Sequence, residues 1–244
     1  MLTESRMAQS KAQLLLRYGK AGDTRRMKQL TPAWFAARRG KITASNVAGL
    51  LGVHPNTAPQ EAYERLMGKR FAGNRATEWG RMNEEHGFTF YQRLAASHRT
   101  LHRLGRIETT GLHTHRNYDW LAGSPDGLID DDGLLEIKCP YSGRVPKTLP
   151  IHHYIQVQML LECTDRKWCD LLVYTLHKYA IFHIVRDKSL FQTFFPFCLR
   201  IHEATQEMHK TCPDTPEYTI RRVTKASMAA CTQLYKKDSF ARFS

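Results

Sequence analysis

The 244-residue chain contains 36 Lys and Arg against 23 Asp and Glu, which gives a formal net charge of +13. This excess of positive charge favours a polyanionic partner, namely DNA, RNA or an anionic membrane surface. The apolar content of 42% is ordinary for a globular protein, and the length suits a single domain with a sizeable core. No apolar run approaches the roughly 20 residues of a transmembrane helix. The six cysteines include no C-x-x-C pair, so we expect a cytosolic protein with reduced cysteines.

The first segment of the chain, residues 1–30, is basic without a clear periodicity, so we expect a leader or a solvated helix. Thr31 and Pro32 then have the residue types of an N-cap and a first helical position. That helix should end near Gly40. After it, Thr43 can cap a second short helix whose first turn contains Ser45.

A longer helix is predicted from about residue 76 to residue 94, where apolar side chains recur at helical spacing. It contains Trp79 and Glu84. From its residue type alone, Glu84 is one more exposed helix carboxylate. Short strands are predicted between residues 105 and 122, with turn residues between them.

Residues 123–140 read as a β-hairpin with an acidic turn centred on Asp131. Such a hairpin places Asp126 opposite Glu136, to within a residue of register, with the two Cβ atoms roughly 4.5–5.5 Å apart. The side-chain period of two along a strand puts Glu136 and Lys138 on one face and Ile137 on the other, towards the core. Two adjacent carboxylates attract a hard divalent cation such as Mg²⁺ or Mn²⁺. A solvated surface hairpin with a chance Glu-x-Lys is the simpler alternative.

The second half of the chain continues with a polar loop over residues 141–150 and a helix over residues 151–163. That helix carries Gln156 and Gln158, of which at least one must be exposed. Two strands, 168–175 and 179–185, and a further helix from residue 187 follow. This order of elements predicts an α/β fold with a central mixed β-sheet flanked by helices.

The hairpin carries a more demanding pattern than Glu-x-Lys alone. Residues 124–127 read S-P-D-G, Glu136 follows ten positions after Asp126, and residues 136–140 read E-I-K-C-P. This run resembles the PD-(D/E)XK nucleases, and within them the phage lambda exonuclease and YqaJ-type viral recombinase group. The resemblance is clearest over residues 31–185. It implies a restriction-endonuclease-like core, as one nuclease domain over residues 31–244.

The resemblance also implies a phosphate pocket. In the family, an Arg and a Ser seven residues later bind the terminal phosphate of the resected strand, which corresponds here to Arg38 and Ser45, with Ser124 as a third contact. Arg39 competes with Arg38 for this role. From the residues alone, Arg38 complements the helix dipole and Ser45 is a capping residue. An arginine fork nevertheless suits phosphate because it donates two parallel hydrogen bonds.

Two further catalytic residues follow from the resemblance only. A family glutamate lies a few residues after a Trp-Gly pair and reaches the metal site, which points to Glu84 after Trp79, with Glu85 as the competitor. The family also has a Q-x-Q helix after the catalytic strand. Its second glutamine, which positions the attacking water or phosphate, corresponds to Gln158.

The implied reaction is Mg²⁺-dependent, with Mn²⁺ as the alternative cation. Asp126, Glu136 and the backbone carbonyl of Ile137 would hold the first of two metal ions, and Asp126 would share the second. Lys138, assisted by Gln158, would position the hydroxide and offset charge on the phosphate.

The expected activity is 5′-to-3′ digestion of one strand of linear double-stranded DNA, which yields 5′-mononucleotides and leaves 3′ overhangs. By the same resemblance we expect a homotrimeric ring, a single-strand annealing protein as partner, no membrane association, and a phage or prophage gene product in the bacterial cytoplasm. Two alternatives stay open. A structure-specific or restriction-type endonuclease would share the hairpin without an end-binding pocket, and a DNA-binding recombination protein would have the fold without catalysis.

Overall fold

The acidic hairpin lies inside a six-stranded mixed sheet, in a computed structural model that describes residues 23–97, 106–215 and 217–239. The strand order is β2-β5-β6-β7-β8-β9. Only the β6–β7 pair is parallel, because a crossing helix separates these two strands in the chain. The strands are β2 (Ile107–Glu108), β5 (Gly127–Ile129), β6 (Gly133–Lys138), β7 (Trp168–Tyr174), β8 (Lys178–Val185) and β9 (Thr232–Ser239). The predicted α/β fold with a mixed sheet is confirmed.

The hairpin register agrees with the sequence prediction. Gly127 pairs with Leu135 and Leu128 with Leu134, so the register carries Asp126, just before β5, to the position opposite Glu136. Asp130 opens the turn with a positive φ of 44°, which aspartate tolerates better than most residues.

A second, three-stranded sheet lies beside the first and supports the segment that contains Arg38 and Ser45. Its order is β1-β4-β3, with β1 (Ile42–Thr43) parallel to β4 (Leu121–Gly123) and β3 (His113–Thr114) antiparallel to it. Since β4 leads directly into Ser124, this sheet brings residues 38–45 close to the start of the hairpin.

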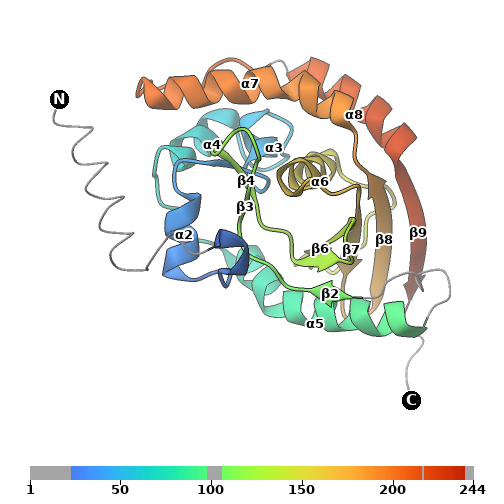
Figure 1. The fold of residues 1–244 in the computed structure, drawn as a ribbon. Coiled ribbons are helices and arrows are strands. Elements are labelled where there is room, and N and C mark those ends of the chain that lie inside the picture. The colour runs from blue at the N-terminus through green and yellow to red at the C-terminus, as the bar shows by residue number, and fades with distance from the viewer. Residues whose placement is uncertain (1–22, 98–105, 216, 240–244) are drawn as a thin grey trace.

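Helices cover both faces of the main sheet (Figure 1). The long helix α5 runs along one face, α6 packs on the other, and α7 and α8 lie outside α6. The helices are η1 (Thr24–Arg26), α2 (Pro32–Arg38), α3 (Val47–Leu50), α4 (Pro59–Leu66), α5 (Arg75–Ser97), α6 (Ile151–Thr164), α7 (Lys188–Gln206) and α8 (Glu217–Cys231). Among the described residues, no helix is long and apolar enough to cross a membrane.

The two largest buried clusters of the described residues fill the spaces between these layers. The larger lies on the α6 side and includes Leu134 and Leu160, and the smaller lies under α5 and includes Leu135 and Ile137. Gly87 lets α5 approach the sheet, because a Cβ there would lie 2.8 Å from a methyl carbon of Ile137. Alternate residues of β6 therefore serve two different cores.

The structure corrects the prediction for the segment after Gly40. Thr43 ends strand β1 and does not cap a helix, because the backbone of residues 42–44 pairs with the start of β4. The helix that follows begins only at Val47, so Ser45 lies in the turn before it. Of the predicted N-terminal leader, residues 1–22 lie outside the described part of the chain, whereas residues 23–30 are described and include η1.

Candidate active site

Asp126 and Glu136 meet at the end of the hairpin as the sequence predicts. Asp126 Oδ2 accepts a hydrogen bond of 2.6 Å from the backbone N–H of Ile137, which fixes this carboxylate beside β6. Burial, and then the negative charges of Glu136 and Glu84, raise the pKa of Asp126 well above its usual value. The carboxyl groups of Asp126, Glu136 and Glu84 therefore lie close together. The Lys138 ammonium and the Ile137 N–H act in the opposite direction and lower the pKa of Asp126.

Glu136 is almost fully buried, with 3% of its surface exposed. Its Oε1 atom accepts hydrogen bonds from Lys138 Nζ and from Gln156 Nε2, each 2.6 Å long. Its Oε2 atom is buried and has no hydrogen-bond partner among the described residues. Such an unpaired carboxylate oxygen is costly in a protein interior, and it is a free ligand position.

Lys138 stays charged in this site for an electrostatic reason. Desolvation acts to lower the pKa of Lys138, but the neighbouring carboxylates Glu136 and Asp126 outweigh it and raise the pKa. The ammonium group is therefore held by the carboxylates that it partly neutralises.

Glu84 reaches the same cluster from α5. Its pKa is raised by burial and then by Glu136, while Lys138 opposes the shift. Glu85, the competing residue, is exposed. Glu84 lines two neighbouring clefts: one of about 540 Å³ that it shares with Lys138, and one of about 800 Å³ that it shares with Asp126. The structure thus brings Glu84 to the hairpin.

Arg38 and Ser45 lie in direct contact. Arg38 Nη2 donates to Ser45 Oγ at 2.6 Å, and the guanidinium lies 4.1 Å from the ring centroid of Trp34. Trp34 Nε1 in turn donates to Ser124 Oγ at 3.0 Å, so the indole connects the three predicted phosphate ligands. Burial lowers the pKa of Arg38 to about 10, and the charge of Glu136 opposes this shift. Arg39 is exposed.

Gln158 does not lie in the site, and the prediction for it is wrong. Its side chain donates to the Val185 carbonyl (2.9 Å) and accepts from the Asp187 N–H (2.8 Å), so it fixes the connection between β8 and α7. Residues advance by about 100° each around an α-helix, so Gln156 and Gln158 point in nearly opposite directions. Packing turns the Gln156 side towards Glu136. The histidines at positions 152 and 153, one turn before Gln156, were the sequence signal for this polar side.

The segment before Thr31 is a second element that the sequence did not place. Gln29 Nε2 donates to the carbonyls of Thr110 and Pro125, each at 2.9 Å, which holds residues 25–30 against the loops next to β2 and β5. The 800 Å³ cleft is bordered by four cations, of which Arg25, Arg26 and Lys28 belong to this segment and Arg81 to α5. Residues predicted as a leader therefore form one wall of the cleft that contains Asp126.

A family model described as the YqaJ-like viral recombinase domain matches residues 33–167, which is more than half of the chain and contains the whole cluster. The chain belongs to this family. The alkaline exonuclease LHK-Exo from Laribacter hongkongensis is 28% identical, with a TM-score of 0.58 over 80% of this chain and 100% of that chain. LHK-Exo in complex with dAMP gives a TM-score of 0.59 at the same identity and coverage.

A phage related exonuclease from Haemophilus somnus 129PT is 13% identical, with a TM-score of 0.50 over 77% of this chain and 96% of that chain, which shows a shared fold alone. No curated protein sequence gave a significant match. The resemblance to the lambda exonuclease and YqaJ-type group is thereby confirmed.

The oxygen atoms at this cluster of the YqaJ-like domain suit a hard divalent cation as ligands. Asp126, Glu136 and the Ile137 carbonyl offer oxygen atoms, which Mg²⁺ and Mn²⁺ prefer, and the buried Glu136 Oε2 lacks another partner among the described residues. Burial and then the charges of Glu136 and Glu84 raise the pKa of Asp126, and a bound cation would offset both effects. As the described side chains stand, no three His, Cys, Asp or Glu residues form a ready cage. The fit therefore rests on two carboxylates and a backbone carbonyl, which leaves room for water and phosphate oxygens.

Proposed function

We propose that this protein is a Mg²⁺-dependent exonuclease that digests one strand of linear double-stranded DNA in the 5′-to-3′ direction. The products would be 5′-mononucleotides and a duplex with 3′ single-stranded overhangs. The observation that carries this proposal is the gathering of Glu84, Asp126, Glu136 and Lys138 in one place, with the Arg38–Ser45 pair close enough for Glu136 to influence the pKa of Arg38. The similarity to an alkaline exonuclease supports it.

In this proposal, Asp126, Glu136 and the Ile137 carbonyl would hold the first cation, and Asp126 would help to hold a second. A Mg²⁺ ion held there would supply Lewis-acid chemistry to the attacking water and to the phosphate oxygens. The Lys138 ammonium orients the attacking water and offsets the charge that develops on the phosphate. Gln156, which shares Glu136 Oε1 with Lys138, takes the positioning role first assigned to Gln158. Glu84 acts at the same cluster from α5.

Arg38 and Ser45 would bind the 5′-terminal phosphate, with Ser124 held nearby through Trp34. The guanidinium can donate several charge-assisted hydrogen bonds to phosphate oxygens. Because this pair lies close enough to Glu136 for that charge to act on Arg38, a bound terminal phosphate would lie near the carboxylates. Release of single nucleotides belongs to the proposal through the family resemblance.

The duplex itself would lie along the larger cleft, whose four cations can neutralise backbone phosphates. The homotrimeric ring, the single-strand annealing partner and the setting in the bacterial cytoplasm belong to the proposal through the family resemblance. A single nuclease domain over residues 31–244 is likewise proposed, with residues 23–30 packed against it.

One assay tests the activity. Linear duplexes labelled at either end and closed circular DNA are incubated with the protein in Mg²⁺ and in EDTA. We expect mononucleotide release from the 5′ end of linear DNA in Mg²⁺ only, and no cutting of circles. Nicking of circles would favour the endonuclease alternative, and binding without hydrolysis in Mg²⁺ would favour a non-catalytic DNA-binding protein.

A Glu136→Gln variant is the matched control for this assay. It keeps the shape of the side chain but removes the charge, so hydrolysis should be abolished while DNA binding in EDTA persists. Hydrolysis at the wild-type rate would reject the assignment of Glu136 as a metal ligand.

A further inference from the structure

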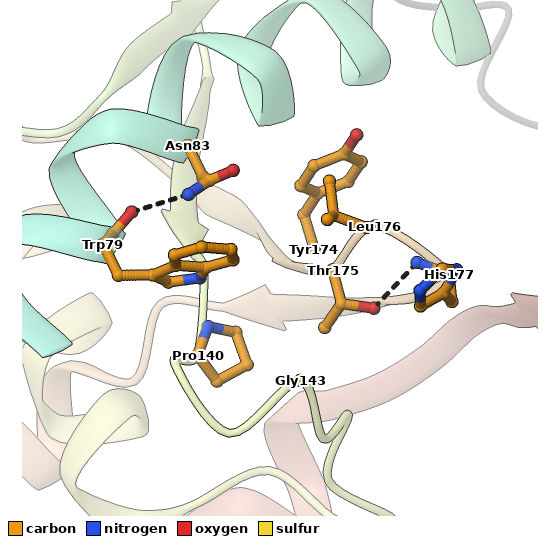
Figure 2. Close-up of a pocket in the computed structure, with 8 residues that line it drawn as sticks. All are labelled: Trp79, Asn83, Pro140, Gly143, Tyr174, Thr175, Leu176 and His177. Atoms are coloured by element: carbon orange, nitrogen blue, oxygen red, sulfur yellow. Dashed lines mark hydrogen bonds between the residues drawn. The ribbon is translucent and has the colours of Figure 1, made fainter.

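A small pocket of about 190 Å³ opens beside the catalytic cleft, and the proposed reaction does not use it (Figure 2). Aromatic and apolar side chains form most of its wall, and a few polar groups lie among them. Its lining consists of Trp79, Asn83, Pro140, Gly143, Tyr174, Thr175, Leu176 and His177. A volume this small suits one planar ring system and not a drug-sized ligand, which requires roughly 300 Å³ or more.

Hydrogen bonds hold two walls of this pocket in place (Figure 2). On α5, Asn83 Nδ2 donates to the Trp79 carbonyl at 2.8 Å. On the turn between β7 and β8, Thr175 Oγ1 accepts from the His177 N–H at 3.3 Å and from the Lys178 N–H at 2.9 Å. The pocket is therefore formed before any ligand binds, which limits the entropic cost of binding.

The pocket is a direct neighbour of the catalytic cleft. Pro140, two residues after Lys138, lines both this pocket and the cleft that contains Lys138 and Glu84. Helix α5 borders both spaces as well, because Trp79 and Asn83 form one stripe along it and Gly80 and Glu84 form the adjacent stripe. DNA bound at the carboxylates would thus have nucleotides within reach of the pocket.

Exposed apolar side chains border the opening of the pocket. Tyr141 is 55% exposed and makes an edge contact with the Trp79 indole at 6.0 Å between ring centroids, and Leu176 is 56% exposed. Nucleobases have both the flat apolar faces and the polar edges that this combination of aromatic, Asn and His side chains fits.

We infer that this pocket binds one unpaired nucleobase of the DNA held in the catalytic cleft. The inference rests on the proposed nuclease function and adds a base-binding subsite to it. Contact with aromatic rings is tolerant of base identity, because every base has a π face, so the pocket would hold a strand without selecting a sequence. Trp79 is the main contact, and Asn83 and His177 supply polar groups for the base edge.

The test uses the full chain in EDTA, so that DNA binds without being cut. Affinities are measured for an intact blunt duplex and for four duplexes that each carry one abasic site, at the first or second nucleotide of either strand. For the wild-type protein, one of these abasic sites should weaken binding about tenfold. Trp79→Ala should weaken binding of intact DNA by the same factor. Binding of that abasic duplex by Trp79→Ala should be no weaker still, because the variant and the abasic site remove the same contact.

Two control variants make the result specific. Trp79→Phe keeps an aromatic ring and should retain most of the affinity and the sensitivity to the abasic site. Tyr218→Ala removes an aromatic side chain that is 78% exposed on α8, and should behave as wild type. Trp79 lies outside the buried clusters of the described chain, so its replacement should leave thermal unfolding close to wild type.

The outcomes separate this inference from the proposed function. Equal affinity for all five duplexes, or equal sensitivity of wild type and Trp79→Ala to the abasic site, would overturn the base pocket while Mg²⁺-dependent hydrolysis of linear DNA remained. Absence of both DNA binding and hydrolysis would overturn the proposed function, and the base pocket with it.

Discussion

Lys138 Nζ lies 2.6 Å from Glu136 Oε1, so two residues of one strand face form a partly buried ion pair at the centre of the site. Replacement of Lys138 by Met removes the cation but keeps much of the side-chain volume. We expect the rate of DNA hydrolysis in Mg²⁺ to fall by about a hundredfold or more, as for the loss of one charge-stabilising donor. Binding in EDTA should fall by less than about tenfold, since one phosphate contact at most is lost.

Lys147→Met is the matched control, because Lys147 is an exposed lysine in the loop after the catalytic strand. It should hydrolyse DNA at close to the wild-type rate. If both variants lost the same small fraction of activity, Lys138 would contribute only to the general positive charge.

Gln156 and Gln158 should separate activity from stability. Gln156→Leu removes a hydrogen bond to Glu136 Oε1 and should lower kcat by roughly tenfold or more, with little change in the urea midpoint. Gln158→Leu leaves the Val185 carbonyl and the Asp187 N–H without their side-chain partner, which should cost about 1–3 kcal/mol of unfolding free energy. A Gln158→Leu protein of unchanged stability but without activity would contradict the placement of Gln158 outside the site.

Arg38 should make digestion sensitive to the end of the DNA. Removal of the 5′-phosphate from the duplex should slow digestion by the wild-type protein by roughly 10- to 100-fold, the value of one or two charge-assisted hydrogen bonds. Arg38→Ala should digest both the phosphorylated and the unphosphorylated duplex slowly, and at nearly equal rates. Arg39→Ala, at an exposed position, should respond as wild type does. Equal sensitivity in the wild-type and Arg38→Ala proteins would reject the phosphate pocket.

The raised pKa of Asp126 makes the stability of the metal-free protein depend on pH. A carboxyl group whose pKa is higher in the folded state stabilises the fold at low pH, and this contribution is lost as pH rises through the raised pKa. Asp126→Asn should therefore raise the Tm of the metal-free protein at pH 8 and leave it nearly unchanged at pH 4. A gain of about 1 kcal/mol corresponds to roughly 2–4 °C for a protein of this size.

In Mg²⁺ at pH 8, the wild-type protein should have a higher Tm than Asp126→Asn. Mg²⁺ stabilises the wild-type protein by binding the ionised carboxylates, and Asp126→Asn has one carboxylate fewer. Thermal melts at both pH values, with Mg²⁺ and with EDTA, measure all of these differences. A metal-free Asp126→Asn protein that melts below wild type at pH 8 would contradict the destabilisation of the Asp126 carboxylate by burial and by the charges of Glu136 and Glu84.

The sequence by itself determined the relation between Asp126, Glu136 and Lys138. A short turn fixes the register of a hairpin, and the period of two along a strand fixes which side chains share a face, so both follow from neighbouring residues. The observed register agrees with this reasoning. The family pattern added Glu84 and the Arg38–Ser45 pair, which the structure brings to the hairpin.

Only the tertiary structure decided which glutamine faces Glu136 and which wall the residues before Thr31 form. The rotation of α6 about its own axis is set by its packing against the sheet, α7 and α8, and a turn of half a circle exchanges Gln156 for Gln158. Residues 25–30 have no periodicity of their own, and they are held in place by the loops next to β2 and β5, about 80 to 100 positions further along the chain. Such long-range contacts depend on how whole elements pack together, and no local pattern encodes them.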